Sequence, residues 1–108
     1  MIARMWHGAV PETKADAYYE YLLRTGLADY RTTPGNQGVT VLRRVQDGVA
    51  HFQLLTFWES YAAIQAFAGP TYEQARYYPE DAAFLLEMEP YVTHYEVLPL
   101  PNDTGLGK

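Results

Sequence analysis

Cysteine is absent from this sequence, and its absence excludes several kinds of chemistry. Without a thiol the chain can form no disulfide bond, no thiolate metal site and no cysteine nucleophile. Long apolar runs are also absent, since no stretch reaches the roughly 18 residues that a membrane-spanning helix needs. The first residues, MIARMWHG, do not form a signal-peptide pattern. We therefore expect a cytoplasmic protein that does not enter a membrane.

Positive charge is scarce as well. Eight Lys and Arg residues stand against 13 Asp and Glu residues, the net charge is −5, and the largest basic group is the pair Arg43-Arg44. Nucleic acids and anionic membranes bind clusters of basic side chains, so both are poor candidate partners. The chain also lacks a glycine-rich phosphate loop and a nucleophile-elbow serine. We expect no tightly bound cofactor.

Apolar and aromatic side chains are abundant. Hydrophobic residues make up 48% of the 108 residues and aromatic residues 15%, with ten tyrosines among them. A chain of this length can bury one core of moderate size, which predicts a single domain. Tyrosine combines apolar area with a hydroxyl that needs a partner, so this composition favours pockets and interfaces.

Turn and capping signals divide the first half of the chain. A strand is predicted over residues 2–7, and a helix opens after Pro11 with Thr13 and Asp16 at capping-box spacing. Its expected inner face consists of Ala15, Tyr18, Tyr19, Leu22 and Leu23. Gly26 fits the left-handed position after this helix, and residues 27–38 read as a loop. Strands over 39–45 and 50–58 flank Asp47-Gly48, which predicts a type I′ hairpin.

The second half continues with a helix capped by Ser60 and ended by Gly69-Pro70, with Ile64 and Phe67 facing inward. Thr71 and Gln74 have capping-box spacing, which predicts a short helix that stops before Pro79. Residues 80–89 read as irregular or helical, and 91–98 as the last strand. Residues 1–98 form the expected domain, and 99–108 a mobile tail.

The resulting order β-α-β-β-α-β is typical of an α+β ferredoxin-like fold. Right-handed crossovers then give an antiparallel sheet of order 4-1-3-2 with both helices on one face. The third strand is apolar on both faces: Phe52, Leu54 and Trp58 share one, and Leu55 and Phe57 the other. Since helices cover only one face, the other needs a cover of its own. We expect a homodimer that packs sheet to sheet.

Three stretches of the chain carry a family resemblance. The loop at 34–39 (PGNQGV), the junction at 55–60 (LTFWES) and the closing strand at 95–97 (YEV) resemble the antibiotic biosynthesis monooxygenase-like group of the dimeric α/β-barrel superfamily. The resemblance covers roughly residues 1–98 and implies a dimeric α/β barrel. Members of this group include cofactor-free oxygenases of polycyclic phenols, haem-degrading oxygenases, small isomerases and proteins without known activity.

The haem-degrading branch of this group has three characteristic residues. They are an Asn on the first strand, a Trp in the second helix and a later His that ligates iron. Alignment on Trp58-Glu59-Ser60 places Phe67 at the Trp position and Tyr77 at the His position, and residues 2–7 contain no Asn. The resemblance therefore argues against haem degradation by that route. Haem binding itself stays open, because tyrosine can ligate ferric haem.

An aromatic pocket is the first candidate site. Its predicted substrate-binding walls are Trp6, Trp58, Phe67, Tyr77 and Tyr78. The alternative is that these side chains simply fill the core. The run at 77–81 (YYPED) predicts a lid over this pocket, with a surface turn as the alternative.

His94 and Arg4 are the predicted catalytic residues. Cofactor-free oxygenation requires a base that ionises the substrate, a group that stabilises the anion, and exclusion of water. His94 suits the base because histidine titrates near neutral pH, and Arg4 suits the anion. The alternatives are a core hydrogen bond for His94 and a salt bridge from Arg4 to Glu96.

A metal site is the less favoured use of the histidines. His7, His51 and His94 fall on neighbouring strands, so three imidazoles could meet. A shift of one residue in register would send one of them to the opposite face, and we predict no metal. His7, Glu87 and Glu89 are instead predicted to be solvated.

These features favour a small oxygenase-like enzyme without a tightly bound cofactor, acting on an aromatic or enolisable molecule between sheet and helices. The alternative is a non-catalytic dimeric protein that binds a small molecule or serves in stress. A haem-handling protein or an isomerase is less favoured. A buried polar group at the base of the pocket would favour the enzyme, and a filled interior the binding protein.

Overall fold

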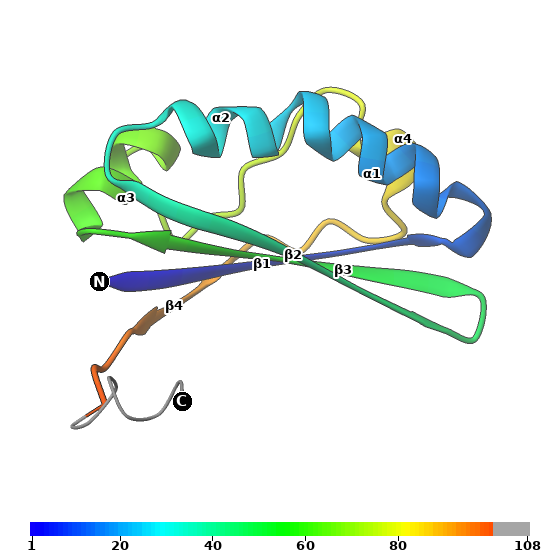
Figure 1. The fold of residues 1–108 in the computed structure, drawn as a ribbon. Coiled ribbons are helices and arrows are strands. Elements are labelled where there is room, and N and C mark those ends of the chain that lie inside the picture. The colour runs from blue at the N-terminus through cyan, green and yellow to red at the C-terminus, as the bar shows by residue number, and fades with distance from the viewer. Residues whose placement is uncertain (101–108) are drawn as a thin grey trace.

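The computed structural model describes residues 1–100 and contains one four-stranded antiparallel sheet (Figure 1). The elements are β1 (Ile2–Pro11), η1 (Glu12–Lys14), α1 (Ala15–Arg24), α2 (Gly26–Thr32), β2 (Asn36–Gln46), β3 (Val49–Trp58), α3 (Tyr61–Ala68), α4 (Asp81–Phe84) and β4 (Thr93–Glu96). The strand order β2-β3-β1-β4 confirms the predicted ferredoxin-like topology. The predicted mobile tail lies, from residue 101 on, outside the described residues.

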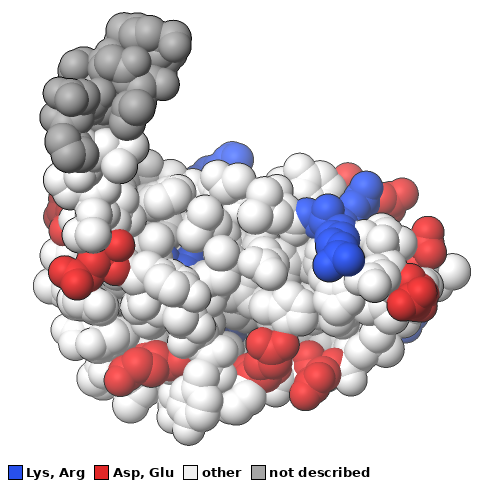
Figure 2. Space-filling model, turned by 90° about the horizontal axis from the view of Figure 1, so that it is seen from below, with Lys and Arg blue, Asp and Glu red and all other residues white. Residues whose placement is uncertain are grey.

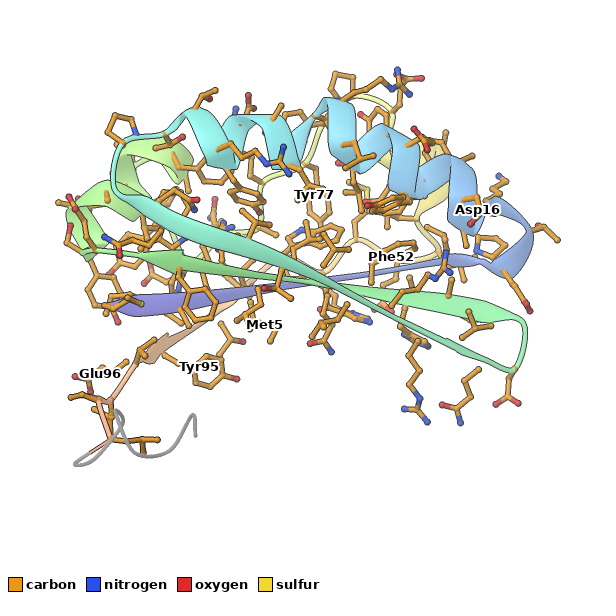
Figure 3. The ribbon with its side chains drawn as sticks, viewed as in Figure 1. Met5, Asp16, Phe52, Tyr77, Tyr95 and Glu96 are labelled. Carbon is orange, nitrogen blue, oxygen red and sulfur yellow. The ribbon has the colours of Figure 1, made fainter. Side chains whose placement is uncertain are left out.

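All the helices lie on one side of the sheet, as Figure 1 shows. No helix within residues 1–100 is long and apolar enough to cross a membrane. In β3, alternate residues face the helices and are buried, whereas Leu55 and Phe57 point to the uncovered face and are partly exposed. The predicted division of this strand into two apolar faces is therefore confirmed. Figure 3 shows Met5 and Tyr95 projecting from the uncovered face and Phe52 projecting toward the helices.

The β2–β3 hairpin forms as predicted. Asp47 has φ 53° and Gly48 has φ 77°, and a type I′ turn requires a positive φ at both positions. The ladder continues from Gln46 opposite Val49 to the far ends of both strands. The turn residues thus set the register as far as Gly38 opposite Phe57, beyond which a bulge shifts it so that Asn36 pairs with Trp58.

The first helix differs from its prediction at both ends. It begins at Ala15 after the short 3-10 turn, and no side chain caps it, so the predicted capping box does not form. Its buried face consists of Ala15, Tyr18, Tyr21 and Leu22. Tyr19 and Leu23 are exposed (39% and 37%), because the sheet contacts a stripe turned by about one residue from the expected one.

A second helix, α2, occupies much of the predicted loop. Gly26 does not end α1 in a left-handed conformation; it is the first residue of α2. Thr25 has a non-helical conformation and separates the two helices. Its Oγ1 donates a hydrogen bond to the Tyr21 carbonyl at 2.8 Å. Leu27 and Tyr30 are buried one turn apart, which is what stabilises this short helix. The loop prediction for this segment was wrong.

The junction after β3 forms as predicted. The Ala63 N–H donates to the Ser60 Oγ at 3.2 Å, which caps α3. Ile64 and Phe67 face the core, and Gly69 ends the helix with φ 87°. Beyond it, the short helix predicted to start at the Thr71/Gln74 capping box and stop before Pro79 was wrong, since Thr71 and Gln74 form only a turn.

The last strand is shorter than predicted and covers only four residues. Residues just before it pair with the preceding loop rather than with β1: Gln74 bridges Tyr91, and the Val92 N–H donates to the Glu73 carbonyl at 2.9 Å. Further back, Glu87 bridges Ala9, so the segment before β4 runs along the outer edge of β1. This path brings Glu89 close to the sheet.

Candidate interior anion site

Arg4 and His94, the two predicted catalytic residues, are direct cross-strand partners. They oppose each other in the β1–β4 ladder and lie on the face that the helices cover. Directly opposed residues of an antiparallel pair have Cβ atoms about 5 Å apart, within reach of one another's side chains. The structure therefore brings this pair together.

Arg4 is a buried cation without a counter-charge. Its side chain is 1% exposed, and its Nη1 donates to the Tyr30 hydroxyl at 3.4 Å. Its Nε and Nη2 have no hydrogen-bond partner among the protein atoms of residues 1–100. The alternative salt bridge to Glu96 does not form, because Glu96 lies opposite Ile2. A buried charge is strongly unfavourable unless it is paired, so this guanidinium is suited to receive an anion.

The Arg4 guanidinium remains positively charged despite its burial. Burial lowers the pKa of Arg4, and the Tyr30 hydroxyl opposes that effect. Arginine nevertheless stays protonated in proteins. Burial raises the pKa of Tyr30, which therefore stays a neutral phenol. The Arg4 guanidinium also lies 5.4 Å from the centre of the Phe67 ring, in the range of a cation–π contact.

His94 has an unpaired ring nitrogen. Its Nε2 is buried and has no protein partner in the described part of the chain, so the alternative core hydrogen bond is not made. Its ring lies against Tyr72 and Tyr61, with centroids 5.3 and 6.0 Å away. Burial lowers the pKa of His94, and the charge of Arg4 lowers it further. His94 is therefore neutral at physiological pH and can accept a proton.

The predicted aromatic walls are packed against one another. Trp58 is fully buried, donates from Nε1 to the Thr56 hydroxyl at 2.9 Å, and lies 5.6 Å from Phe67 between ring centroids. Trp6 packs edge to face against Tyr77, with 6.1 Å between the ring centroids. These rings fill most of the space between sheet and helices.

A small cavity of about 20 Å³ lies in the interior beside these rings. It is lined by Trp6, Tyr18, Leu22, Gly26, Tyr30, Leu54, Arg76, Tyr78 and Asp81. This volume accommodates about one water molecule, whereas ligand pockets measure roughly 300–1,000 Å³. Of the five predicted walls only Trp6 and Tyr78 line it, so the expected open aromatic pocket is closed in this conformation.

The predicted lid segment covers this cavity and is held down by polar contacts. The Tyr78 hydroxyl donates to Asp29, and Arg76 Nη2 donates to the same carboxylate at 3.4 Å. The Tyr78 N–H and the Tyr18 hydroxyl both donate to buried Asp81, at 2.6 and 2.9 Å. Burial raises the pKa of Tyr78 and of Tyr18, so both phenols remain donors. We call the contacts of Tyr78 and Arg76 with Asp29 the Asp29 latch.

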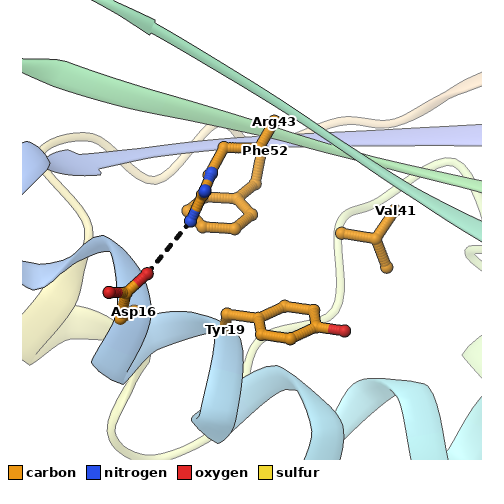
Figure 4. Close-up of a pocket in the computed structure, with 5 residues that line it drawn as sticks. All are labelled: Asp16, Tyr19, Val41, Arg43 and Phe52. Atoms are coloured by element: carbon orange, nitrogen blue, oxygen red, sulfur yellow. Dashed lines mark hydrogen bonds and ion pairs between the residues drawn. The ribbon is translucent and has the colours of Figure 1, made fainter.

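A larger groove of about 430 Å³ lies between α1 and the β2 edge of the sheet (Figure 4). It is lined by Asp16, Tyr19, Val41, Arg43 and Phe52. Arg43 Nη1 donates to Asp16 Oδ1 at 3.1 Å across it. Phe52 packs edge-on against Tyr18, a wall of the interior cavity, so these two rings separate the groove from the interior. The sequence did not indicate this groove, because it depends on the rotation of α1.

The three histidines do not form one site. His7 and His51 lie on the uncovered face and are joined by a hydrogen bond of 3.1 Å, whereas His94 lies on the helix face. The alternation along the strands separates them, so the meeting of three imidazoles that the strand order left open does not occur. Within residues 1–100 no group of three or more His, Asp or Glu side chains is arranged to hold a metal ion. His7 and Glu89, predicted to be solvated, instead contact each other at 2.5 Å.

The residues at the haem-branch positions do not fit haem. Phe67 is buried between the guanidinium groups of Arg4 and Arg76. The Tyr77 hydroxyl donates to the Glu89 carbonyl, and burial raises the pKa of Tyr77 to about 12, so its oxygen is a protonated donor and a poor iron ligand. The interior cavity is also far smaller than a porphyrin.

Comparisons with known proteins show the fold. No family model and no curated protein matches the sequence. Among solved structures, a candidate antibiotic biosynthesis monooxygenase from Nitrosomonas europaea is 19% identical with a TM-score of 0.65, covering 92% of this chain and 100% of its own. The heme-degrader MhuD from Mycobacterium tuberculosis, solved with two hemes in its active site, is 21% identical with a TM-score of 0.60, covering 92% and 97%.

A candidate antibiotic biosynthesis monooxygenase from Bacillus cereus is 15% identical with a TM-score of 0.59, covering 92% of this chain and 96% of its own. All these identities are low, so the likeness concerns the backbone arrangement and not the site. At the level of fold the resemblance seen in the sequence is confirmed: this chain has the ferredoxin-like fold of the antibiotic biosynthesis monooxygenase proteins.

Proposed function

We propose that this chain is a cofactor-independent monooxygenase-like enzyme whose small aromatic or enolisable substrate binds as an anion between sheet and helices. The observation that carries the proposal is the buried guanidinium of Arg4, which lacks a counter-charge and lies opposite the unpaired imidazole of His94. A cation and a neutral base side by side are what ionisation of a weak acid requires. Polar groups left unpaired in a core are unfavourable for stability and are common at functional sites.

The proposed reaction begins with transfer of a substrate proton to Nε2 of His94. The resulting phenolate or enolate pairs with Arg4, and its electron-rich carbon reduces O₂. For a CH₂ group that becomes a carbonyl, one oxygen atom stays on the carbon and the other leaves with the two hydrogens as water. The substrate supplies all the electrons, so the protein contributes only the base, the cation and a dry environment.

Substrate entry requires the interior to open, because the cavity of about 20 Å³ is too small for an aromatic ring. The Asp29 latch is the proposed moving part. Release of Tyr78 and Arg76 from Asp29 would uncover the space beside Tyr30 and Arg4. The exposed ion pair of Arg76 with Asp29 contributes little to stability, so opening the latch mainly requires breaking the part-buried hydrogen bond of the Tyr78 hydroxyl.

We also propose a homodimer in which the uncovered sheet faces pack together. Figure 2, which views this face, shows few charged side chains across its middle. Leu42 and Tyr95 are exposed there (46% and 54%), and Met5 and Phe57 lie between them in the sheet order. A contiguous apolar face supports an interface. Sedimentation analysis of the wild type and of Phe57→Glu tests this: a wild-type dimer that dissociates in the variant is expected, and a wild-type monomer would refute it.

Oxygen uptake tests the enzymatic proposal. The purified chain, with a metal chelator present, would be offered polycyclic phenols, hydroquinones and 1,3-diketones in an oxygen electrode. We expect uptake with at least one compound, abolished by Arg4→Met and reduced about 100-fold or more by His94→Gln. Arg31→Met, a change at an exposed position, is the matched control and should retain uptake. Uptake that survives Arg4→Met would refute the role of this site.

A non-catalytic binding protein is the second candidate, and the nearly filled interior favours it. In that case a ligand would bind and displace the lid without any consumption of oxygen. Ligand-dependent quenching of the fluorescence of Trp6 and Trp58, without oxygen uptake by any compound in the panel, would decide for this alternative.

A further inference from the structure

Three side chains on the uncovered face form a continuous chain of hydrogen bonds. Glu89 Oε2 lies 2.5 Å from His7 Nδ1, and His7 Nε2 lies 3.1 Å from His51 Nδ1. Glu89 belongs to the segment that runs along the edge of β1, and the two histidines belong to β1 and β3. Their rings are nearly parallel, with an interplanar angle of 19°. This arrangement uses residues that the interior site does not use.

The chemistry of the three groups fixes where the protons lie. An ionised carboxylate only accepts hydrogen bonds, so His7 Nδ1 carries a proton and donates it to Glu89. In a neutral ring the other nitrogen then accepts, so His7 Nε2 receives a hydrogen bond from Nδ1–H of His51. Nε2 of His51 is left with a free lone pair. The carboxylate thus orients the first imidazole as in a catalytic triad, and the first imidazole orients the second.

A proton accepted by His51 need not stay there. If Nε2 of His51 gains a proton, the proton on its Nδ1 can shift to His7 Nε2, and the positive charge then lies next to Glu89. Glu89 thus stabilises the positive charge, although Glu89 itself does not contact a molecule that binds at His51. His51 is therefore the accepting end of a proton relay.

This end lies in a groove of about 400 Å³ on the uncovered face. The groove is lined by His7, Leu42, Arg43, Arg44, Gln46, His51 and Gln53. Arg44 lies directly opposite His51 in the β2–β3 ladder, and no carboxylate within residues 1–100 forms an ion pair with it. Arg43 pairs with Asp16 instead. Glu89 is an acidic side chain near this groove, and it contacts His7, one of the residues that line it.

We propose that Glu89, His7 and His51 form a second acid–base site that takes small organic acids. Such an acid is already ionised at neutral pH, so its anion pairs with Arg44 while Nε2 of His51 takes up one proton from the solvent, and no bond of the acid is broken. The reaction involves no oxidation and needs no co-reactant. The site does not depend on the proposed oxygenase, since it lies on the opposite face of the sheet from Arg4 and His94.

The groove also lies apart from the apolar part of the face. His51 and Arg44 are near the hairpin end of the sheet, whereas Phe57 and Tyr95 are near the opposite end. In Figure 2 the largest group of basic side chains lies toward one end of this face with acidic side chains beside it, and the middle of the face carries few charges. A second copy that covers the apolar part would leave room for a small acid at the hairpin end.

Long-range ¹H–¹⁵N NMR of the imidazoles tests the relay in the full-length chain at a pH where histidines are neutral. We expect the proton on Nδ1 in both His7 and His51, with His94 as an internal reference. In Glu89→Gln the side-chain amide can donate to His7, and we expect the preference of His7 to be lost. A proton on Nε2 of His51 in the wild type would overturn the proposal.

Titration calorimetry with benzoate in two buffers of different ionisation enthalpy tests the site itself. We expect binding to be accompanied by proton uptake, which shows as a buffer-dependent heat. Arg44→Gln should weaken binding about tenfold, while Arg31→Gln, a change at an exposed position outside the groove, should change it far less. Binding without proton uptake, equal loss in both variants, or no binding would each overturn the proposal.

Discussion

Replacement of Arg4 by methionine should make the unliganded protein more stable. In the wild type two guanidinium nitrogens are buried without a protein partner, and each unsatisfied buried group is unfavourable by about 1–3 kcal/mol. The variant loses the hydrogen bond of 3.4 Å to Tyr30, worth about 1 kcal/mol, and the contact over Phe67, worth about 1 kcal/mol. The shorter side chain loses roughly another 1 kcal/mol of packing. At the middle of that range the two nitrogens are unfavourable by about 4 kcal/mol together, which exceeds the losses of about 3 kcal/mol, so the balance is a gain of about 1 kcal/mol.

Urea unfolding followed by circular dichroism measures this difference, provided that the slope of the transition is unchanged. Arg76→Met is the matched control, because Arg76 is fully engaged: it donates to the Phe67 carbonyl at 2.9 Å and to Asp29 at 3.4 Å. We expect the control to be destabilised by about 1–2 kcal/mol. If Arg4→Met were destabilised as much as the control, Arg4 would be a structural residue, and the reasoning that assigns it to an anion would fail.

Three further predictions concern local packing and pH. Ser60→Ala should lower the free energy of unfolding by about 1 kcal/mol, because the Ala63 N–H loses its acceptor, and Ser60→Asp should restore most of it in the same urea assay. Gly8→Ala should destabilise by about 1–3 kcal/mol, since the new methyl would come within 2.4 Å of the Trp6 ring; an unchanged unfolding midpoint would contradict this packing. The lowered pKa of His94 means that the unfolded chain binds more protons than the folded one below pH 6.5, so stability should fall as the pH drops through that value. His94→Gln should remove this part of the acid sensitivity, and equal pH profiles of the variant and the wild type would show that the histidine does not contribute.

Features fixed by a few neighbouring residues could be predicted from the sequence. Asp47-Gly48 and Ser60 act through their own backbone geometry, so the hairpin and the start of α3 were found. The alternation along β3 placed Trp58 and Phe57 on opposite faces for the same reason. Helix α2 was missed, because a short helix depends on the burial of Leu27 and Tyr30 against the rest of the fold.

The site could be predicted only in part. Strand order predicts that Arg4 and His94 lie on neighbouring strands, but their direct opposition depends on the register, which the sequence does not fix. The contact of Glu89 with His7 depends on the path of the irregular segment before β4, for which no local pattern exists. The closed interior depends likewise on the Asp29 latch, in which Asp29 lies 47 and 49 residues from Arg76 and Tyr78 in the sequence.

The central claim is that Arg4 holds the anion of a weak acid, and 4-nitrophenol tests it most directly, because only its ionised form is yellow. The protein would be titrated into 4-nitrophenol at a pH below the pKa of the free phenol. We expect a saturable rise of the yellow band with the wild type and with Arg31→Met, and none with Arg4→Met. An equal rise with Arg4→Met, or no rise with the wild type, would contradict it.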